Sequence, residues 1–269
     1  MLRLPAVAGQ FYPANPQELA ALTRRLTKQS DARSKLRVKA CLVPHADYVY
    51  SGSVAGAVFE RIQIPRNVIV LGVRHFPRGA DAAIISEGAW QTPLGDLSID
   101  YSLAQEIKKA CPLLKEDAVA HEREHSLEVQ LPFLQALRPE AQFVPIALGT
   151  TQWADLETIG KAIGHVVAAA REEILLLTTS DLNHYEDEAT TQRKDALAVS
   201  QLEAMNARGL FEVCRTEAIS MCGLGPAIAM LFALEKMGAT RAEVVTHATS
   251  AAVSGDYRRV VGYAGLIFD

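Results

Sequence analysis

Long hydrophobic runs are absent from this 269-residue sequence, and so is any excess of positive charge. No apolar stretch approaches the roughly 20 residues needed to cross a bilayer, and the first residues lack the apolar core of a signal peptide. We therefore expect no membrane association and a cytoplasmic location. The formal net charge is −4 and the Lys and Arg residues are scattered, so we also expect no nucleic-acid partner.

Cysteine is scarce, and no C-x-x-C pair occurs among Cys41, Cys111, Cys214 and Cys222. In a chain without a secretory signal this pattern predicts reduced thiols rather than a disulfide framework. We expect the first three to be small buried side chains. Cys222 differs because it lies in a glycine-bracketed loop before Pro226, the predicted first residue of a helix. A helix N-terminus favours the thiolate, which binds metals or attacks electrophiles.

Linkers, internal repeats and low-complexity tracts are also missing. Hydrophobic residues make up 49% of the chain and charged residues 22%, an ordinary globular composition that can form a sizeable core. We therefore predict a single domain over residues 1–269.

Short apolar runs alternate with segments of helical periodicity, which is typical of buried parallel strands joined by helices. The predicted strands are residues 38–43, 67–72, 82–86, 143–148, 174–178, 243–247 and 260–268. The predicted helices are residues 15–28, 53–62, 103–110, 155–171, 188–205 and 226–237, with one more carrying Leu127, Leu131 and Leu134. This order predicts a three-layer α/β/α fold with a central, mostly parallel or mixed sheet.

Histidines follow three of the predicted strands within a few residues. His45 follows the first strand, His75 the second, and Asp181 and His184 follow residues 174–178. Because ligand sites form at the shared carboxyl edge of such a sheet, three imidazoles delivered there indicate a metal site. The alternative for His45 and His75 is a turn or loop histidine bonded to the backbone.

Asp181 and His184 form a compact polar cluster in which the aspartate can orient the imidazole or support a metal ligand. The alternative for Asp181 is an Asx turn. His165 and His247 have no such polar neighbours in the sequence, and we interpret both as structural.

Residues 121–125 read His-Glu-Arg-Glu-His and so satisfy H-E-x-x-H, the zinc metalloprotease signature. Pro132 would disturb the long helix that such enzymes use, and the metzincin continuation fails at Glu128 and Leu131. We therefore disfavour a protease. We expect instead that His125 alone, near the start of a helix, enters the pocket as acid, base or substrate contact, and that His121 is incidental.

Six motifs in order along the chain resemble those of the Memo family, whose bacterial and archaeal members are also called AmmeMemoRadiSam system protein B. They are residues 9–13, 44–46 with 50–52, 92–95, 124–128, 180–181 with 184–185, and 222–223 with 226. The resemblance covers nearly the whole chain. It implies a fold similar to that of the class III extradiol dioxygenases of the LigB type, which are non-haem iron enzymes.

Carried over by position, the resemblance implies His45, His75 and Cys222 as ligands of a single transition-metal ion. Iron or copper is favoured and zinc is possible. His125, Asp181 and His184 match the polar groups around the pocket. The implied partners are a small-molecule substrate and, by the family's system name, an AMMECR-type protein and a radical SAM protein.

Two positions depart from the family pattern. Asp47 stands where the family usually has glycine, and Gly72-Val73-Arg74-His75 replaces Gly-Pro-x-His. Either Asp47 and Arg74 pair with each other, or Arg74 faces an anionic substrate.

The ligand set bears on the reaction type. Extradiol enzymes use two histidines and a carboxylate, whereas Cys222 makes a softer site, open to Cu(I), Fe(II) or Zn(II), so ring cleavage does not follow from the fold. We expect redox or dioxygenase-like chemistry on a small molecule, with His125 and His184 moving protons and Asp181 orienting His184. Two alternatives stay open: a zinc-dependent hydrolase using the same pocket, and a module that binds a peptide or metabolite without turnover.

Overall fold

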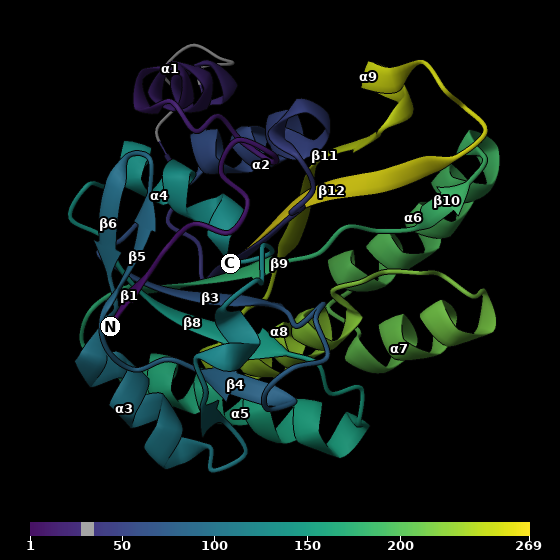
Figure 1. The fold of residues 1–269 in the computed structure, drawn as a ribbon. Coiled ribbons are helices and arrows are strands. Elements are labelled where there is room, and N and C mark those ends of the chain that lie inside the picture. The colour runs from purple at the N-terminus through teal and green to yellow at the C-terminus, as the bar shows by residue number, and fades with distance from the viewer. Residues whose placement is uncertain (28–34) are drawn as a thin grey trace.

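The computed structural model describes residues 1–27 and 35–269, and a mixed β-sheet runs through its centre (Figure 1). The strands of this sheet are β2 (Ala40–Val43), β3 (Asn67–Val73), β4 (Ala82–Ile84), β7 (Lys115–Glu116), β8 (Gln142–Leu148), β9 (Ile174–Thr179), β10 (His184–Glu186), β11 (Ala242–Thr249) and β12 (Val260–Phe268). Their order is β10-β12-β2-β9-β3-β8-β4-β7, and β11 also pairs with β12. Strands β2, β9, β3 and β8 are parallel, while β12 and β4 join them antiparallel.

The register of the parallel strands brings their carboxyl ends to one edge of the sheet. Val43 at the end of β2 pairs with Thr179 at the end of β9, and Leu71 of β3 pairs with Thr178. The loops that follow these three strands therefore start side by side.

Helices cover both faces of the sheet, which confirms the predicted three-layer α/β/α architecture (Figure 1). The helices are α1 (Pro16–Leu26), α2 (Tyr48–Arg61), α3 (Tyr101–Ala110), α4 (Leu131–Leu137), α5 (Trp153–Ala169), α6 (Glu188–Glu203), α7 (Ala207–Thr216), α8 (Leu224–Met237) and α9 (Ala251–Ser254). Alternate strand residues point to opposite faces. Leu42 and Leu71 pack into one core with α3, α5 and α8, whereas Val43 and Val70 pack into a second core with α1, α2 and α4.

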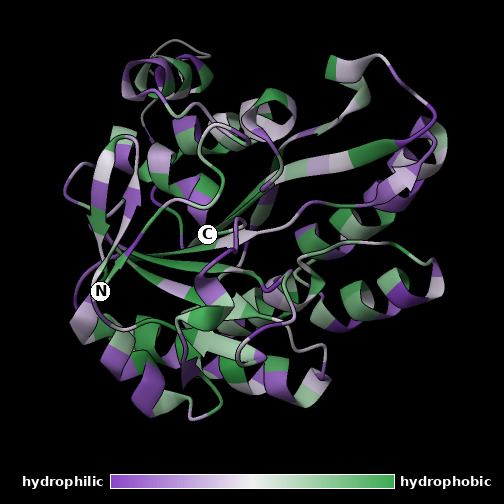
Figure 2. Cartoon of the chain, viewed as in Figure 1, coloured by the Kyte–Doolittle hydropathy of each residue, from purple (hydrophilic) through white to green (hydrophobic). Residues whose placement is uncertain are grey.

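The apolar residues concentrate where these layers meet, and Figure 2 shows hydrophobic residues along the central strands and polar ones on the outer helix surfaces. Among the described helices none combines the length and the apolar character that crossing a bilayer requires.

Several predicted boundaries shift in the structure. Asn15 caps α1 as expected, because its side chain accepts the N–H groups of Gln17 and Glu18, whereas the predicted helix end near Lys28 lies outside the described residues. Helix α2 starts at Tyr48, five residues before the predicted start. Helix α8 starts at Leu224 after an N-cap at Gly223, so Pro226 is its third residue and not its first.

Several parts of the fold were not predicted, among them the short elements β7, β10 and α9. Strands β1 (Leu2–Arg3), β5 (Ala89–Thr92) and β6 (Gly95–Ser98) form a small separate sheet of three short strands. Helix α7 was also missed, although the Asn206 side chain caps it and its two buried residues, Leu210 and Cys214, are four residues apart.

A buried ion pair ties the N-terminal segment to the loop that carries His125. The Arg3 guanidinium pairs with Glu128 and donates to the carbonyl oxygens of His121 (2.9 Å) and Glu124 (2.7 Å). Glu128 also accepts the Tyr12 hydroxyl at 2.6 Å. Because both charges are buried and fully bonded, loss of either partner leaves the other charge uncompensated.

We predict that Glu128→Ala lowers the free energy of unfolding by about 3–5 kcal/mol, since it strands the buried Arg3 charge. The control is Glu173→Ala, which removes an exposed pair with Arg37 and is expected to cost less than about 1 kcal/mol. Denaturant unfolding of both variants measures the difference. Equal losses of unfolding free energy in the two variants would show that the buried Arg3–Glu128 pair contributes no more to stability than the exposed pair.

Candidate metal centre

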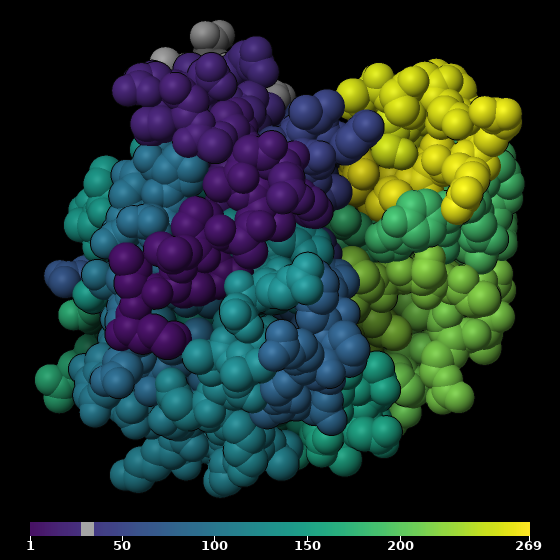
Figure 3. All heavy atoms as spheres, in the orientation of Figure 1, coloured from purple at the N-terminus to yellow at the C-terminus, as the bar shows by residue number. Residues whose placement is uncertain are grey.

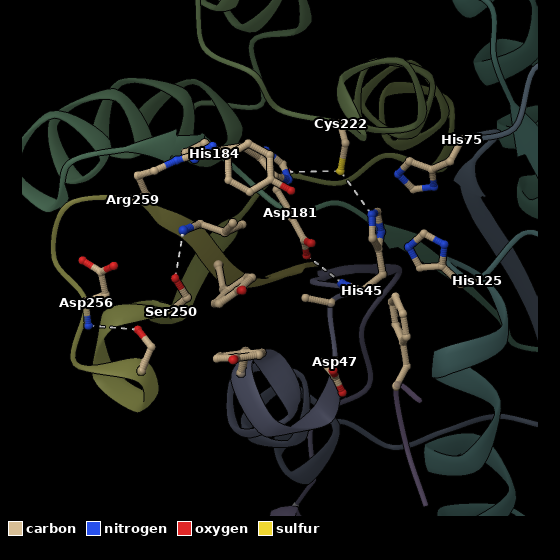
Figure 4. Close-up of a pocket in the computed structure, with 17 residues that line it drawn as sticks. His45, Asp47, His75, His125, Asp181, His184, Cys222, Ser250, Asp256 and Arg259 are labelled. Atoms are coloured by element: carbon tan, nitrogen blue, oxygen red, sulfur yellow. Dashed lines mark hydrogen bonds between the residues drawn. The ribbon is translucent and has the colours of Figure 1, made fainter. Parts of the chain in front are cut away.

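A pocket of about 620 Å³ opens at the carboxyl edge of the sheet. In the space-filling view a hollow separates the yellow C-terminal residues from the purple and blue N-terminal part of the chain (Figure 3). All six residues predicted for the site line this pocket, and Figure 4 shows them gathered around one centre. They are His45, His75, His125, Asp181, His184 and Cys222.

Two imidazoles and one sulfur from distant parts of the chain converge in this pocket. His45 follows β2, His75 follows β3, and Cys222 lies in the loop before α8. Their ligand atoms all lie within 4.8 Å of one another, and His45 Nε2 is 3.1 Å from Cys222 Sγ. Metal bonds of about 2.0–2.3 Å in a tetrahedral site put neighbouring ligand atoms roughly 3.5 Å apart. The spacing therefore fits one ion.

Glu124 holds His75 from behind. Its Oε1 accepts the Nδ1–H of His75 at 2.9 Å and its Oε2 accepts the His75 main-chain N–H at 2.7 Å. The N–H of Ser126 donates to Oε1 at 2.8 Å. Burial alone would raise the pKa of Glu124, but the hydrogen bond and charge of His75, with the charge of His125, lower it to about 2. Because Nδ1 carries the proton, the Nε2 lone pair of His75 is available to a metal.

His45 is fixed from two sides. Its Nδ1 lies 3.0 Å from the Thr179 hydroxyl, and its main-chain N–H donates to Asp181 Oδ1 at 2.8 Å. Burial raises the pKa of Asp181 to about 6, although the N–H of His45 partly offsets this effect. Burial also lowers the pKa of His45 well below its usual value, and the neighbouring imidazoles add to the shift. His45 is therefore neutral at neutral pH.

His184 takes its orientation from Ser220 and not from Asp181. Its Nδ1 donates to the Ser220 carbonyl oxygen at 2.9 Å, and its main-chain N–H donates to Ser220 Oγ at 2.8 Å. A carbonyl only accepts, so the proton is on Nδ1 and Nε2 has a lone pair. The predicted role of Asp181 thus differs from the observed one, since Asp181 holds the backbone of His45.

His125 lies flat against His75, with ring centroids 4.6 Å apart, and it also contacts the rings of Phe11 at 4.8 Å and His45 at 5.6 Å. Burial lowers the pKa of His125 to about 4, although the nearby Glu124 raises it in part. His125 is therefore a neutral base inside the pocket at neutral pH.

The Cys222 thiol does not have the lowered pKa that its position before a helix predicts. Burial raises its pKa, and the charge of Asp181 raises it further. The effect of the α8 N-terminus is weaker than the desolvation of a thiolate in this pocket. Binding a cation would offset both costs, because a coordinating thiol loses its proton.

Two other groups of possible ligands share these residues. One is His75 with Glu124 and His125, and the other is Asp181 with His184 and Cys222. Their carboxylates already accept main-chain N–H groups. The two histidines and the cysteine described above therefore form the set whose donor atoms are least committed elsewhere.

The protease signature has no structural basis here. His121 ends a short 3₁₀ helix (Val119–His121), and residues 122–125 are not helical, so His121 and His125 do not share a helix. The Nδ1 of His121 donates to the Asp117 carbonyl oxygen at 2.9 Å. His165 is exposed on α5, and His247 pairs with Asp195 at 2.8 Å.

The predicted pair between Asp47 and Arg74 is wrong. Arg74 pairs with Asp81 and does not line the pocket, whereas Asp47 does. The proposed contact of Arg74 with an anionic substrate in this pocket is therefore also wrong. Asp81 lies in the loop of residues 78–81, which turns back beside Arg74. Asp81 was not among the predicted partners of Arg74.

Comparisons with known proteins agree with this architecture. A family described as "Memo-like protein" matches residues 3–267. The chain is 36% identical to a MEMO1 family protein of Methanopyrus kandleri, covering 100% of this chain and 99% of that protein. It is 38% identical to one of Aquifex aeolicus, covering 99% of each. A solved structure of an uncharacterized protein from Escherichia coli K12 covers 84% of this chain and 99% of that one, with a TM-score of 0.50 and 14% identity, and shows a shared fold.

We predict that N-ethylmaleimide modifies Cys222 before the other three cysteines in the folded protein, after treatment with a chelator. Only Cys222 lines the pocket, while Cys41, Cys111 and Cys214 are buried. Peptide mass spectrometry identifies the modified thiol, and Cys222→Ala should stay unmodified until it is denatured. First modification of any buried cysteine would contradict the geometry.

Proposed function

Because the chain belongs to the Memo-like family, we propose that it holds one transition-metal ion, iron or copper, on His45, His75 and Cys222 for redox or dioxygenase-like chemistry on a small molecule. The observation that carries the proposal is the convergence of three ligand atoms within 4.8 Å from three separate loops. A thiolate with two imidazoles is a soft donor set that suits Cu(I), Fe(II) or Zn(II).

The hydrogen bonds behind the ligands support this proposal. Glu124 fixes the ring of His75 with its Nε2 directed away from the carboxylate, and Thr179 and Asp181 together restrict His45. Such partners orient metal ligands and raise their basicity. A ligand set held in this way loses little conformational entropy when an ion binds.

A bound ion would supply an open coordination position and electron exchange with the substrate. The rest of the chemistry falls to the side chains. Figure 4 shows His184 and His125 on opposite sides of His45 and Cys222. His184 has a lone pair on Nε2, and His125 is a neutral imidazole at neutral pH because burial lowers its pKa to about 4. Each can accept a proton from a bound hydroxyl group.

We predict that anaerobically purified protein contains about one equivalent of iron or copper and that Cys222→Ala loses most of it, since the sulfur is one of three ligands. Cys214→Ala is the control, because Cys214 is buried in α7 away from the pocket. Elemental analysis measures the content. Unchanged metal in Cys222→Ala contradicts the thiolate ligand. Stoichiometric zinc without iron or copper would support a hydrolase instead.

Glu124→Gln should weaken metal binding by about 10- to 100-fold, the usual effect of changing a partner behind a ligating histidine. Glu122→Gln in the same loop is the matched control, because Glu122 is exposed and pairs only loosely with Arg78. Competition with a chromophoric chelator measures both affinities. Equal affinities in the two variants would show that Glu124 does not support a ligand.

A further inference from the structure

The end of the pocket remote from the candidate ligands has its own chemistry. Ser250, Ser254, Asp256 and Arg259 line it, all from the segment that joins β11 to β12. Figure 4 shows Ser250, Asp256 and Arg259 on the side opposite His75 and the ligand cluster. A substrate of moderate size would therefore contact both ends.

Two adjacent arginines in this segment have different partners. Arg258 donates from Nε to Asp256 Oδ1 at 3.2 Å, and its main-chain N–H donates to the same oxygen at 3.0 Å. The negative charge of Asp256 is thereby engaged by Arg258. Arg259 lines the pocket and, among the described residues, forms no ion pair. Its guanidinium packs 5.5 Å over the ring of Tyr185.

The two serines leave hydroxyl protons for a ligand. Ser250 Oγ accepts the N–H of Val261 at 3.0 Å, and Ser254 Oγ accepts the N–H of Asp256 at 3.1 Å. Within the described part of the chain neither hydroxyl donates to a protein acceptor. Because a hydroxyl both donates and accepts, each serine has a proton to offer. This end of the pocket thus presents a guanidinium and two hydroxyl donors.

Tyr185 is held in a strained conformation beside these donors. Its φ is 63°, in the left-handed region, and the pairing of β10 with β12 is irregular between His184 and Glu186. This conformation costs roughly 1–2 kcal/mol for a residue with a side chain, and bulges often redirect a side chain next to a functional site. The ring lies between His184, at 5.5 Å, and Arg259.

We propose that this rim, formed by Tyr185, Ser250, Ser254 and Arg259, binds the carboxylate of an aromatic carboxylic acid whose ring extends toward the ligand cluster. The proposal rests on the proposed function, in which a metal ion on His45, His75 and Cys222 acts on the other end of the substrate. A planar guanidinium matches a carboxylate with two parallel N–H groups. Phe11, Tyr50 and Tyr263 also line the pocket and suit an aromatic ring.

A single negative charge fits this pocket better than a phosphate does. Arg259 is the one arginine in the lining, and no lysine accompanies it, whereas Asp47, Asp181 and Asp256 also face the cavity. A dianion would meet one cation and the carboxyl groups of Asp47 and Asp181, besides that of Asp256, which pairs with Arg258, so repulsion would offset much of the attraction.

The test measures binding of benzoate, benzamide and phenyl phosphate to the purified full chain by titration calorimetry. We expect benzoate to bind more tightly than benzamide. Arg259→Gln should weaken benzoate binding by about 10-fold, the usual value of a charge-assisted hydrogen bond, and change benzamide binding less than about 2-fold. Arg193→Gln is the control, because its exposed charge pairs with Glu217 and neither residue lines the pocket, and it should change neither ligand by more than about 2-fold.

Three outcomes would overturn the proposal: no saturable binding of benzoate, equal benzoate affinity in Arg259→Gln and wild type, or an equal loss in Arg193→Gln. Tighter binding of phenyl phosphate than of benzoate, with the same dependence on Arg259, would overturn the choice of a carboxylate. The same titration with Cys222→Ala separates the two proposals. If Cys222→Ala keeps both its metal and its Arg259-dependent binding of benzoate, the proposed metal site is contradicted and the carboxylate site is not.

Discussion

The parallel pairing of β2, β9 and β3 is the constraint on which the rest of the site depends. Because Val43 pairs with Thr179 and Leu71 with Thr178, the three strands end together and their loops leave from one edge. His45 and His75 are fixed to this edge within two residues of their strands. The strands are buried between two helical layers, so their ends can move little relative to one another.

Two buried carboxyl groups then set the electrostatics of the pocket in opposite ways. Glu124 accepts a ring N–H and two main-chain N–H groups, which lower its pKa to about 2 and keep it charged behind His75. Asp181 is buried with less compensation, and its pKa rises to about 6. Glu124 is therefore a carboxylate behind His75 over a wide pH range, whereas Asp181, beside His45 and Cys222, takes up a proton near pH 6. A cation among the ligands would be stabilised by both.

Local sequence patterns were enough to predict the layers, and they marked the strand-end histidines and the loop cysteine as candidates. The full set of six candidate residues came from the resemblance to the Memo family, and the structure brings all six to one pocket. The partners behind those residues were harder to predict. Glu124 lies within a motif that assigns it no role, and His184 is oriented by Ser220, 36 residues away. The left-handed Tyr185 and the pocket position of Arg259 depend on how β10 pairs with β12. Such contacts depend on long-range packing, which periodicity does not encode.

X-ray absorption spectroscopy on the protein loaded with iron or copper tests the central claim most directly, since it reports the atoms bound to the ion. The account predicts one sulfur scatterer at about 2.3 Å and nitrogen scatterers of imidazole type at about 2.0–2.1 Å, close to the bond lengths that such ligands make in zinc sites. A first shell of oxygen alone, with no sulfur, would contradict the claim that the three loops bind one ion together.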